Sequence, residues 1–512
     1  MKATPSSIDT ANAPAERPDT DLFTRPLWRA EDLGKPIPAS PHAASVAMPL
    51  WEHVVRYEQK DPALLDTLQC GYPRFVFNPI VNELFRECRR RFANENELCL
   101  AFPSRRIAER CARFLDETAG FPSRIEDFGL NDVHAVVFSN EAFDAAKSFW
   151  QHYGNIVSSR LAQATLAGRE LPYETTDAKR TLTERIASLI GSVAKDIRLY
   201  PSGMAALSGA LDCVRANRPG AKTIQLGLPY VDLLRIQSKW GPEATFYPAA
   251  NAEVFDALAW QVENEHIAAV FCEHPGNPLL QCADIERLST LLRAHGVPLV
   301  VDETLGSFLN VDVQPFADIV VTSLTKYFSG VGDVMGGSLV LSTASPFHDV
   351  LARHLRRQFE DRLWEEDAAV LEANSRDFVE RMQRINANAE QICDVLRTHP
   401  KVQHVYFPKF ETPDFYKLAC HTNAGYGGMF SLVLKGAAAN APRFYDALRV
   451  SKGPSLGTNY TLACPYTLLA HFDELDWVES IGVSPHLVRV SVGIEESGDL
   501  IGRFEQALDS VE

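Results

Sequence analysis

The feature that most constrains the fold of this 512-residue sequence is a repeated strand–helix pattern that begins near residue 181. Short apolar runs recur as TIQLGL, AAVFCEH, PLVVDET, DIVVTSL and GGSLVLS, with helical segments such as ADIERLSTLLRAHG between them. Apolar strands that alternate with helices are typical of parallel sheets covered on both faces. We therefore predict an α/β fold with a mostly parallel central sheet and helices on both of its faces.

The rest of the chain divides into three further parts. Residues 1–45 are rich in Pro, Ala, Ser and Asp and are expected to form a flexible arm. Residues 46–155 combine helical periodicity with two short strands, ELCLAF and VHAVVF, and are expected to form an α/β extension of unknown role. The strand-like runs GGMFSLVLKG and LVRVSVGIE predict a smaller α/β domain at 346–512, which leaves 156–345 as the large domain.

Composition argues against several classes of partner. The net charge is −16, from 66 acidic and 50 basic side chains, which disfavours nucleic acid or an anionic membrane. There is no apolar run long enough to span a membrane and no hydrophobic segment of a secretory signal at the N-terminus. The ten cysteines are scattered, without the spacing of a metal site, and indicate reduced thiols. We therefore expect a cytoplasmic protein without a metal.

Polar residues follow two of the predicted strands, where α/β sheets bind their ligands. Lys326 comes after the run DIVVTSL, and a desolvated lysine amine is a nucleophile toward an aldehyde, although an ordinary lysine there would extend to solvent. The hydroxyls of Ser323 and Thr325 beside it suit a phosphate. Asp302 follows PLVV, and a buried carboxylate at that point needs a cation such as a protonated pyridine nitrogen, unless it caps a helix or forms a structural ion pair.

Two turns add to this pattern. In LYPSGMAALSG a strand leads through Ser202, Gly203 and Met204 into a helix whose first amides can bind an anion, although a simple Ser cap is the plain alternative. In EHPGNPLL, Asn277 lies in an irregular turn after a strand, which is equally consistent with an ordinary loop. Together with Lys326, these features describe a site for pyridoxal 5′-phosphate (PLP).

At these residues the chain resembles the Cys/Met-metabolism family of PLP enzymes, from about Ser158 to the C-terminus. SLTKYFSGVGDVMGGSLV is similar to the lysine signature of the family, and SGMAA to its phosphate-binding motif. The resemblance implies a fold type I PLP-dependent transferase, with 156–345 as the PLP-binding domain, in which Lys326 bonds to the cofactor aldehyde. It implies as cofactor-binding residues Ser202, Gly203, Met204, Tyr230, Asp302, Thr304, Ser323, Thr325, Lys326 and Arg160.

The resemblance also implies residues that bind the substrate. SLG at Ser455–Gly457 and Arg489 in LVRVSVGIEES match the carboxylate site of the family, where a guanidinium binds a carboxylate through two hydrogen bonds. Asn277 is expected to contact the cofactor or the same carboxylate. Arg235, five residues after Tyr230, is a candidate for the acyl group or for the carboxylate of an incoming thiol, and a solvated helix residue is as good an interpretation.

Within the family, the segments LGKPIPASPHAASVAMPLWEHVVRYE, FWQHYGNIVSSR and KGPSLGTNYTLACPYTLLAHF are most similar to fungal-type cystathionine γ-synthases. One stretch departs from the family. Many members have a Tyr-x-Arg pair that reaches the phosphate in the neighbouring subunit, and here SSR keeps Arg160 but has Ser158 in place of the tyrosine. The resemblance still implies a homodimer or homotetramer with shared active sites.

The activity that the resemblance implies is γ-replacement on an O-acyl-L-homoserine with L-cysteine, which gives cystathionine. Lys326 would serve as the base, Asp302 would keep the ring nitrogen protonated, and Tyr230 would stack on the ring and assist proton transfer. A different carbon, nitrogen or sulfur nucleophile, and a γ-lyase that releases a 2-oxo acid, remain as alternatives. A catalytically silent scaffold is a third, and the presence of both Lys326 and Asp302 argues against it.

Overall fold

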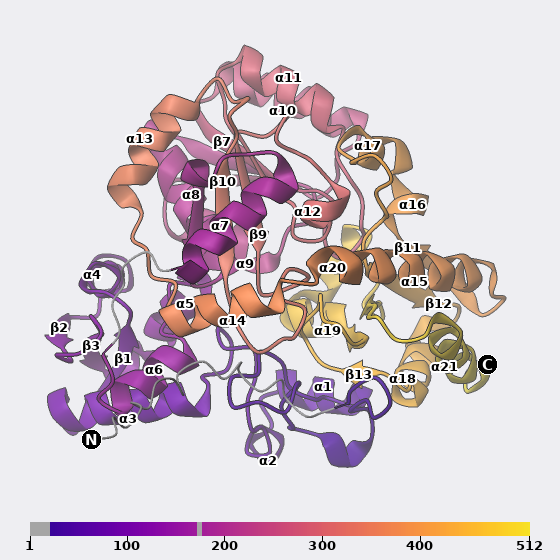
Figure 1. The fold of residues 1–512 in the computed structure, drawn as a ribbon, viewed down its shortest axis with the longest axis horizontal. Coiled ribbons are helices and arrows are strands. Elements are labelled where there is room, and N and C mark those ends of the chain that lie inside the picture. The colour runs from indigo at the N-terminus through magenta and orange to yellow at the C-terminus, as the bar shows by residue number, and fades with distance from the viewer. Residues whose placement is uncertain (1–20, 171–176) are drawn as a thin grey trace, which may run out of the picture.

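The structure is a computed structural model that describes residues 21–170 and 177–512. In this part of the chain it contains three β-sheets with helices packed around them (Figure 1). The predicted flexible arm, residues 1–45, lies partly outside the described residues. None of the helices in the described ranges is both long enough and apolar enough to cross a membrane.

The central sheet has seven strands in the order β4-β10-β9-β8-β7-β5-β6. Every neighbouring pair from β9 to β6 is parallel, and β10 runs antiparallel to both β9 and β4. The prediction of a mostly parallel sheet is therefore confirmed. Its strands are β4 (Ile197–Tyr200), β5 (Lys222–Leu226), β6 (Ala244–Tyr247), β7 (Ile267–Glu273), β8 (Leu299–Asp302), β9 (Ile319–Ser323) and β10 (Gly337–Leu341).

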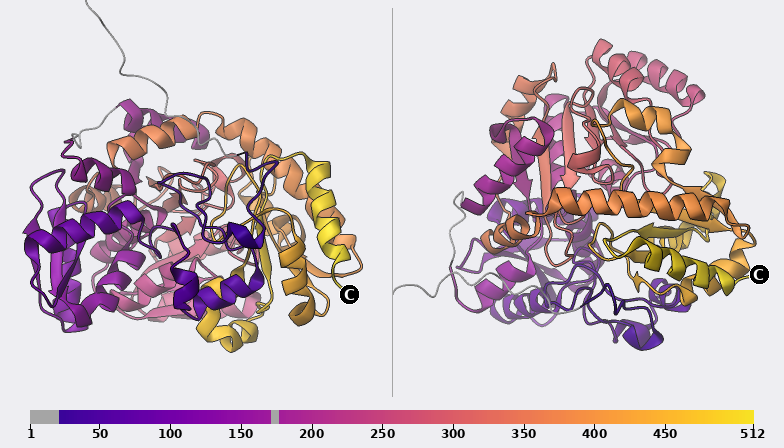
Figure 2. Two further views of the ribbon diagram at one scale, coloured as in Figure 1. Left: turned by 90° about the horizontal axis from the view of Figure 1, so that it is seen from below. Right: turned by 45° about the vertical axis from the view of Figure 1, so that its right-hand side comes forward.

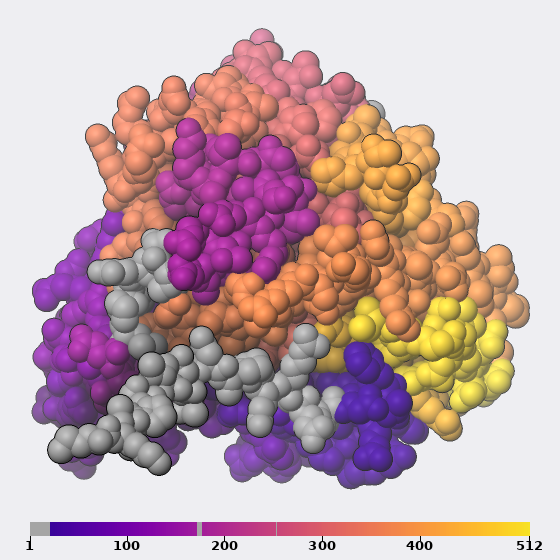
Figure 3. All heavy atoms as spheres, in the orientation of Figure 1, coloured from indigo at the N-terminus to yellow at the C-terminus, as the bar shows by residue number. Residues whose placement is uncertain are grey.

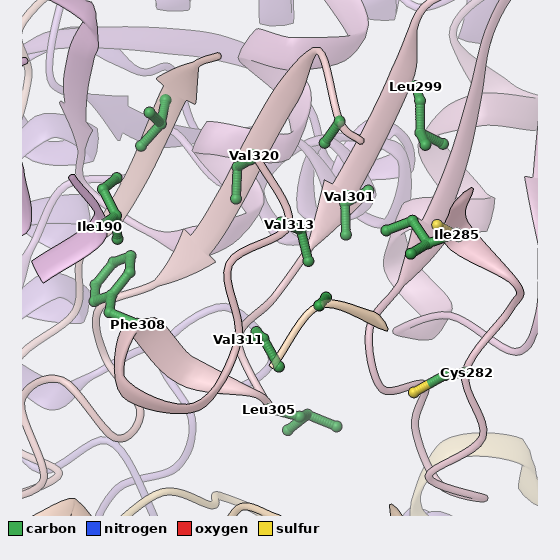
Figure 4. Packing of buried hydrophobic residues seen from close by; sticks show 14 of the residues in the cluster. Ile190, Cys282, Ile285, Leu299, Val301, Leu305, Phe308, Val311, Val313 and Val320 are labelled. Atoms are coloured by element: carbon green, nitrogen blue, oxygen red, sulfur yellow. The ribbon is translucent and has the colours of Figure 1, made fainter. Parts of the chain in front are cut away.

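Helices cover both faces of this sheet, because successive strand residues point to opposite sides. In β8, Val300 packs on one face, whereas Leu299 and Val301 pack on the other. Figure 4 shows the second face, where these two residues lie in one cluster with Val320 and Ile285. The first face is covered by α8 (Gly203–Asn217), α9 (Val231–Lys239) and α13 (His348–Gln358), and the second by α7 (Asp177–Ile190), α10 (Ala252–Asn264) and α11 (Ile285–Ala294).

The C-terminal part forms a second sheet, of five strands in the order β11-β12-β15-β14-β13. The long helix α15 (Phe378–Thr398) joins it to the large domain, because Met382 packs in the core of the central sheet and Ile392 in the C-terminal core (Figure 2). The strands are β11 (Val402–Tyr406), β12 (Met429–Leu434), β13 (Ser451–Lys452), β14 (Leu462–Pro465) and β15 (Val488–Ser491), and the helices α18 (Ala437–Ala447), α19 (Tyr466–His471), α20 (Leu475–Ser480) and α21 (Ser497–Asp509).

The N-terminal extension has its own antiparallel sheet, in the order β1-β3-β2, and its own apolar core. The two predicted strands ELCLAF and VHAVVF are β1 (Glu97–Phe102) and β3 (His134–Ser139). The edge strand β2 (Ser123–Asp127) was not predicted, since the sequence SRIED has little apolar character. Helices α3 (Pro79–Phe92), α4 (Arg105–Arg113), α5 (Phe143–Tyr153) and α6 (Ser159–Leu166) complete this part.

Residues 21–58 pack against the C-terminal domain, although the sequence analysis placed 21–45 in a flexible arm. Figure 3 shows these indigo residues beside the yellow end of the chain. Ile37 is fully buried, and the backbone amide of Met48 donates a hydrogen bond of 2.9 Å to the Lys452 carbonyl. Buried apolar side chains hold this segment in place despite its Pro-rich composition. Helix α1 (Trp51–Glu58) ends this segment and α2 (Pro62–Leu65) follows it. The remaining short helices are α12 (Ser307–Asn310), α14 (Glu365–Asn374), α16 (Pro408–Glu411) and α17 (Pro413–Leu418).

Candidate active site

A cavity of about 870 Å³ lies at the carboxyl ends of the parallel strands. Glu273 at the end of β7, Asp302 at the end of β8 and Ser323 at the end of β9 all line it, together with Lys326. These strands are neighbours in the sheet, so side chains that lie 50 residues apart in the sequence meet at one edge. The sequence analysis placed the site at this edge.

Lys326 lies in the turn that follows β9, and its amine faces two parts of the chain that are distant in sequence. The Nζ atom is 3.3 Å from Ser455 Oγ and 4.6 Å from the centre of the Tyr72 ring. Burial lowers the pKa of Lys326, and the nearby cations Arg489 and Arg74 lower it further. A larger fraction of the amine is therefore neutral, which is the form that attacks an aldehyde.

The glycine of SLG allows this close contact. Gly457 has φ +74°, and a Cβ atom there would lie 2.8 Å from the backbone carbon of Lys326. Only glycine fits at that point, so the C-terminal domain approaches the lysine closely. Ser455 in the same segment does not line the cavity, yet its hydroxyl contacts the lysine amine.

Two carboxylates lie side by side on the floor of the cavity. Asp302 is the register partner of Glu273 in the neighbouring strand, and its Oδ1 accepts a 2.9 Å hydrogen bond from the Thr304 amide. Burial raises the pKa of Asp302, and burial together with the Asp302 charge raises the pKa of Glu273 well above its usual range. A protonated ring nitrogen at this place would form an ion pair with the carboxylate beside it and so stabilise the ionised form of that carboxylate.

Glu273 is a candidate that the sequence analysis missed. Its Oε1 accepts a 2.5 Å hydrogen bond from the Tyr230 amide, which fixes the start of α9 beside the cavity. The signal was available, because Glu273 follows the apolar run of β7 just as Asp302 follows that of β8. In the segment EHPGNP, the sequence analysis considered only Asn277 as a candidate site residue.

The N-terminus of α8 forms a cradle for an anion. The backbones of Gly203 and Met204 are in the first turn of this 15-residue helix, and both residues line the cavity beside Ser323 and Thr304. A Cβ atom on Gly203 would come 2.7 Å from Ser323 Cβ, so a side chain there would close the cradle. Helix amides, a hydroxyl and open space together fit the phosphate of PLP.

Three residues expected around the phosphate do not line the cavity. Ser202 caps α8, accepting from the Ala205 amide at 3.1 Å and donating to the Gly154 carbonyl at 2.8 Å. The Thr325 hydroxyl exchanges hydrogen bonds with the backbone of Gly336. Their hydroxyls are already satisfied by the local turns, so the first amides of α8 and the Ser323 hydroxyl are the groups of this cradle that could bind a phosphate.

Arg160 is the third, and it lies away from the cavity of its own chain. Its guanidinium donates to the Asp333 carbonyl at 2.9 Å and pairs with Asp367 at 3.1 Å. Through the ion pair with Asp367, Arg160 links α6 to α14 in its own chain. Ser158, which stands beside it in SSR, caps α6 by accepting a hydrogen bond from the Leu161 amide.

Arg489 is placed to bind a carboxylate. It is 5% exposed, and it donates to the Pro454 carbonyl at 2.9 Å and to Asn277 Oδ1 at 3.4 Å. The Asn277 amide in turn donates to the Tyr466 hydroxyl at 3.1 Å, and the Tyr466 ring lies under the guanidinium. No Asp or Glu of the described residues pairs with Arg489, so its charge is available to a ligand.

The N-terminal extension contributes a Tyr-x-Arg pair that the sequence analysis did not identify. In GYPRF, Tyr72 contacts Lys326, and Arg74 donates to the Tyr230 hydroxyl and to the Gln151 carbonyl. Arg74 also pairs with Asp232 at 2.6 Å, with side chains 1% and 2% exposed. The spacing sought in SSR was present here, some 85 residues earlier in the sequence.

These cations alter the phenols beside them. Burial alone would raise the pKa of Tyr72, but Lys326 and Arg74 outweigh it and lower the pKa. For Tyr230 burial dominates and raises the pKa well above its usual range, with Arg74 acting in the opposite direction.

Arg235, the candidate for a second anion, lines the cavity but is exposed, and its guanidinium pairs with Glu474 at 3.4 Å.

Comparisons with known proteins identify the family to which the chain belongs. A family model for "Cys/Met metabolism PLP-dependent enzyme" matches residues 139–509, and one for "Fungal trans-sulfuration enzyme, N-terminal domain" matches residues 80–158. A cystathionine gamma-synthase of Neurospora crassa is 34% identical, over 94% of this chain and 98% of its own length. A protein named alanine racemase ungC, of Aspergillus violaceofuscus, is 30% identical, over 96% of this chain and 98% of its own.

Solved structures share the fold. A cystathionine gamma synthase from Xanthomonas oryzae pv. oryzae, in complex with aminoacrylate and cysteine, matches with a TM-score of 0.57 and 26% identity, over 66% of this chain and 87% of that one. The match to the Cys/Met family model spans most of the chain, and it includes Lys326 and the strand ends that surround it. The chain therefore belongs to the Cys/Met metabolism PLP-dependent enzyme family, and its cofactor is pyridoxal 5′-phosphate.

Proposed function

We propose that this enzyme catalyses γ-replacement on an O-acyl-L-homoserine with L-cysteine as the nucleophile, giving cystathionine. The observation that carries the proposal is the placement of Lys326, Asp302 and Arg489 around one cavity. A base, a ring-nitrogen partner and a carboxylate anchor are the three functions that the reaction needs. The name of the Neurospora crassa relative supports the same reaction.

PLP held at Lys326 would supply an electron sink for the negative charge that develops at Cα and Cβ of an amino-acid substrate. The guanidinium of Arg489 holds the substrate carboxylate, which directs Cα toward Lys326. The lysine amine takes the proton from Cα, gives it up, and then takes one from Cβ. The C–O bond at Cγ breaks and the acid leaves as a carboxylate. The cysteine thiol loses its proton as its sulfur forms the new C–S bond at Cγ, and Lys326 returns a proton first to Cβ and then to Cα.

Tyr230 is placed to manage the proton of the incoming thiol. Its hydroxyl accepts a hydrogen bond from Arg74, but burial outweighs that charge and keeps the pKa of the phenol well above its usual range. The protonated phenol can relay the thiol proton, donating its own proton while its oxygen receives the new one as the C–S bond forms. Ser455, 3.3 Å from the Lys326 amine, orients the base between the two proton transfers.

A γ-lyase would use the same residues and would release a 2-oxo acid instead. The distinguishing experiment supplies O-acetyl-, O-succinyl- and O-phosphohomoserine, each with and without cysteine, and measures cystathionine against 2-oxobutanoate. Cystathionine as the major product supports our proposal, and equal release of 2-oxobutanoate with and without cysteine contradicts it. Lys326→Ala is the matched control. It should lack the absorbance band at about 420 nm that borohydride removes from the wild-type holoenzyme.

The partners are proposed on the same basis. We expect amino-acid substrates and a homodimer or homotetramer, in a cytoplasmic enzyme. Sedimentation equilibrium of the holoenzyme gives the number of chains directly. A monomer that retains full activity would contradict the shared active sites that the resemblance implied, and would agree with Tyr72 and Arg74 serving the cavity of their own chain.

A further inference from the structure

The N-terminal extension and the segment before it build the outer part of the active-site cavity. Many of their residues line it. The cavity volume of about 870 Å³ lies near the upper end of the range for small-molecule sites, so the cavity has room for a ligand much larger than one amino acid. This outer compartment has an apolar wall. The apolar or aromatic residues that form it are Tyr57, Leu65, Leu68, Phe75, Phe77 and Pro79.

Basic side chains gather around this compartment. Seven Lys or Arg residues line the cavity against four Asp or Glu, in a chain whose net charge is −16. Three of the basic residues lie outside the machinery described above and come from the N-terminal part: Lys60, Arg86 and Lys147. The local excess of positive charge therefore comes from this part of the chain and attracts anions into the cavity.

Lys147 stands out among the three. It is half-buried on α5, its Nζ lies 5.8 Å from the centre of the Phe77 ring, and no carboxylate of the described residues pairs with it. Burial lowers the pKa of Lys147, and the neighbouring Lys60 lowers it further. Lys60 itself is paired with Glu58 at 3.4 Å. Asp144 acts in the opposite direction, as the smallest of the three effects on this pKa. A partly desolvated cation that faces a cavity and forms no ion pair can bind an anion.

We propose that Lys147 binds a substrate carboxylate in the outer compartment, away from the carboxylate that Arg489 holds. This inference rests on the proposed γ-replacement. The carboxylate comes either from the nucleophile, as in cysteine, or from the far end of a dicarboxylic acyl group, as in O-succinylhomoserine. Lys147 is thus a specificity-determining residue, and the extension that carries it shapes the choice of substrate.

The test compares Lys147→Gln with the wild-type holoenzyme on paired substrates. O-Succinylhomoserine against O-acetylhomoserine tests the acyl group, and cysteine against cysteamine, which lacks the carboxylate, tests the nucleophile. The expected result is a KM about tenfold higher for the member of one pair that carries the additional carboxylate. Its kcat and both constants of the member without this carboxylate should be unchanged, because the lost contact binds the ground state and the transition state equally. Lys147→Arg should retain the wild-type KM.

Lys239→Gln is the matched control. Lys239 lies on α9, its Nζ is 3.3 Å from Ser148 Oγ beside Lys147, and it does not line the cavity. It should leave all four KM values unchanged. The proposal would be overturned if Lys147→Gln changed the KM equally for substrates with and without the additional carboxylate, or changed none of the four KM values.

A binding measurement separates this inference from the proposed function. Equilibrium dialysis of O-succinylhomoserine, O-acetylhomoserine, cysteine and cysteamine against the Lys326→Ala protein reports binding without turnover. If no γ-replacement is detected, but Lys147→Gln weakens binding of the anionic ligand about tenfold in this background, the proposed reaction fails and the carboxylate site stands. If γ-replacement is detected and binding is unaffected, the carboxylate site fails alone.

Discussion

Three basic side chains line the active-site cavity with little exposure, Arg74 and Arg489 buried and Lys326 half-buried, and each meets the cost of desolvation in a different way. Lys326 does so by a lowered pKa, Arg489 through carbonyl acceptors and an aromatic ring, and Arg74 through an ion pair with Asp232. Only the first two have their charge or amine available for a ligand. Arg74 instead acts on Tyr230, to which it donates a hydrogen bond, and therefore has both a structural and a chemical role.

At the residue scale we predict that Arg74→Gln lowers both stability and activity. The change leaves Asp232, whose side chain is 2% exposed, without its cation, and removal of one partner of a buried pair costs about 3–5 kcal/mol. It also removes the hydrogen bond that positions the Tyr230 hydroxyl for proton transfer, so kcat/KM should fall about 100-fold. Urea denaturation and steady-state kinetics measure the two effects.

The double variant Arg74→Gln/Asp232→Asn separates these effects. It removes both charges of the pair, so most of the lost unfolding free energy should return, while the activity should stay low. A single variant as stable as the wild type would show that Asp232 does not depend on Arg74 for its counter-charge.

At the scale of elements, the strand ends provide side chains and helix α8 provides backbone. Asp302, Glu273 and Ser323 each end a strand, and the register of the parallel sheet brings them together. The cradle at the start of α8 depends on the absence of a side chain at Gly203. The strands therefore contribute polar side chains to the site, whereas α8 contributes backbone amides and the open space above Gly203.

We predict that Gly203→Ala weakens PLP binding without unfolding the protein. The new methyl group would meet Ser323 Cβ at 2.7 Å, and any adjustment narrows the cradle. The dissociation constant of PLP, measured by titrating the apoprotein, should rise about tenfold or more.

Gly502→Ala is the control for this change. Gly502 lies inside α21, with no atom within 4 Å of an added Cβ, so alanine there should add up to about 1 kcal/mol of stability and leave PLP affinity unchanged. An unaltered affinity in Gly203→Ala would mean that the phosphate is bound elsewhere.

At the scale of the whole molecule, the segment before α1 ties the active-site wall to the C-terminal domain. Lys452 is fully buried, and its Nζ donates to the carbonyls of Pro49 at 2.9 Å and Asp446 at 3.1 Å. The wall residues Tyr72 and Arg74 follow this tether in the chain. The cavity therefore depends on contacts between the two ends of the sequence.

This tether predicts a pH dependence of stability. Burial lowers the pKa of Lys452 from its ordinary 10.5 to about 7, so between these values the unfolded chain binds a proton that the folded chain does not. The free energy of unfolding should therefore rise with pH from about 7 to about 10.5 through this group. Lys452→Met should lack this part of the slope in calorimetry at a series of pH values.

Lys435→Met is the control for that experiment, since Lys435 is exposed at the end of β12. It should keep the wild-type slope. The same slope in Lys452→Met would show that Lys452 remains charged in the folded protein.

The sequence alone predicted most strands of the large domain and the residues at the centre of the site. Five mostly apolar runs became β5, β7, β8, β9 and β10, because a strand covered by helices on both faces needs apolar residues on both sides. Lys326, Asp302 and Gly203 lie at the cavity, since strand ends and helix starts are local features. The half-buried strand β6 and the polar edge strand β2 carry no such run and were missed.

The sequence by itself determined which residues follow each strand and which turn precedes α8, because these depend on neighbours a few positions away. Only the tertiary structure decided what closes the cavity. Arg74 meets Asp232 and Tyr230 across 158 and 156 positions, and Lys326 meets Ser455 across 129. Contacts at such separations depend on how whole domains pack, and no local periodicity encodes them.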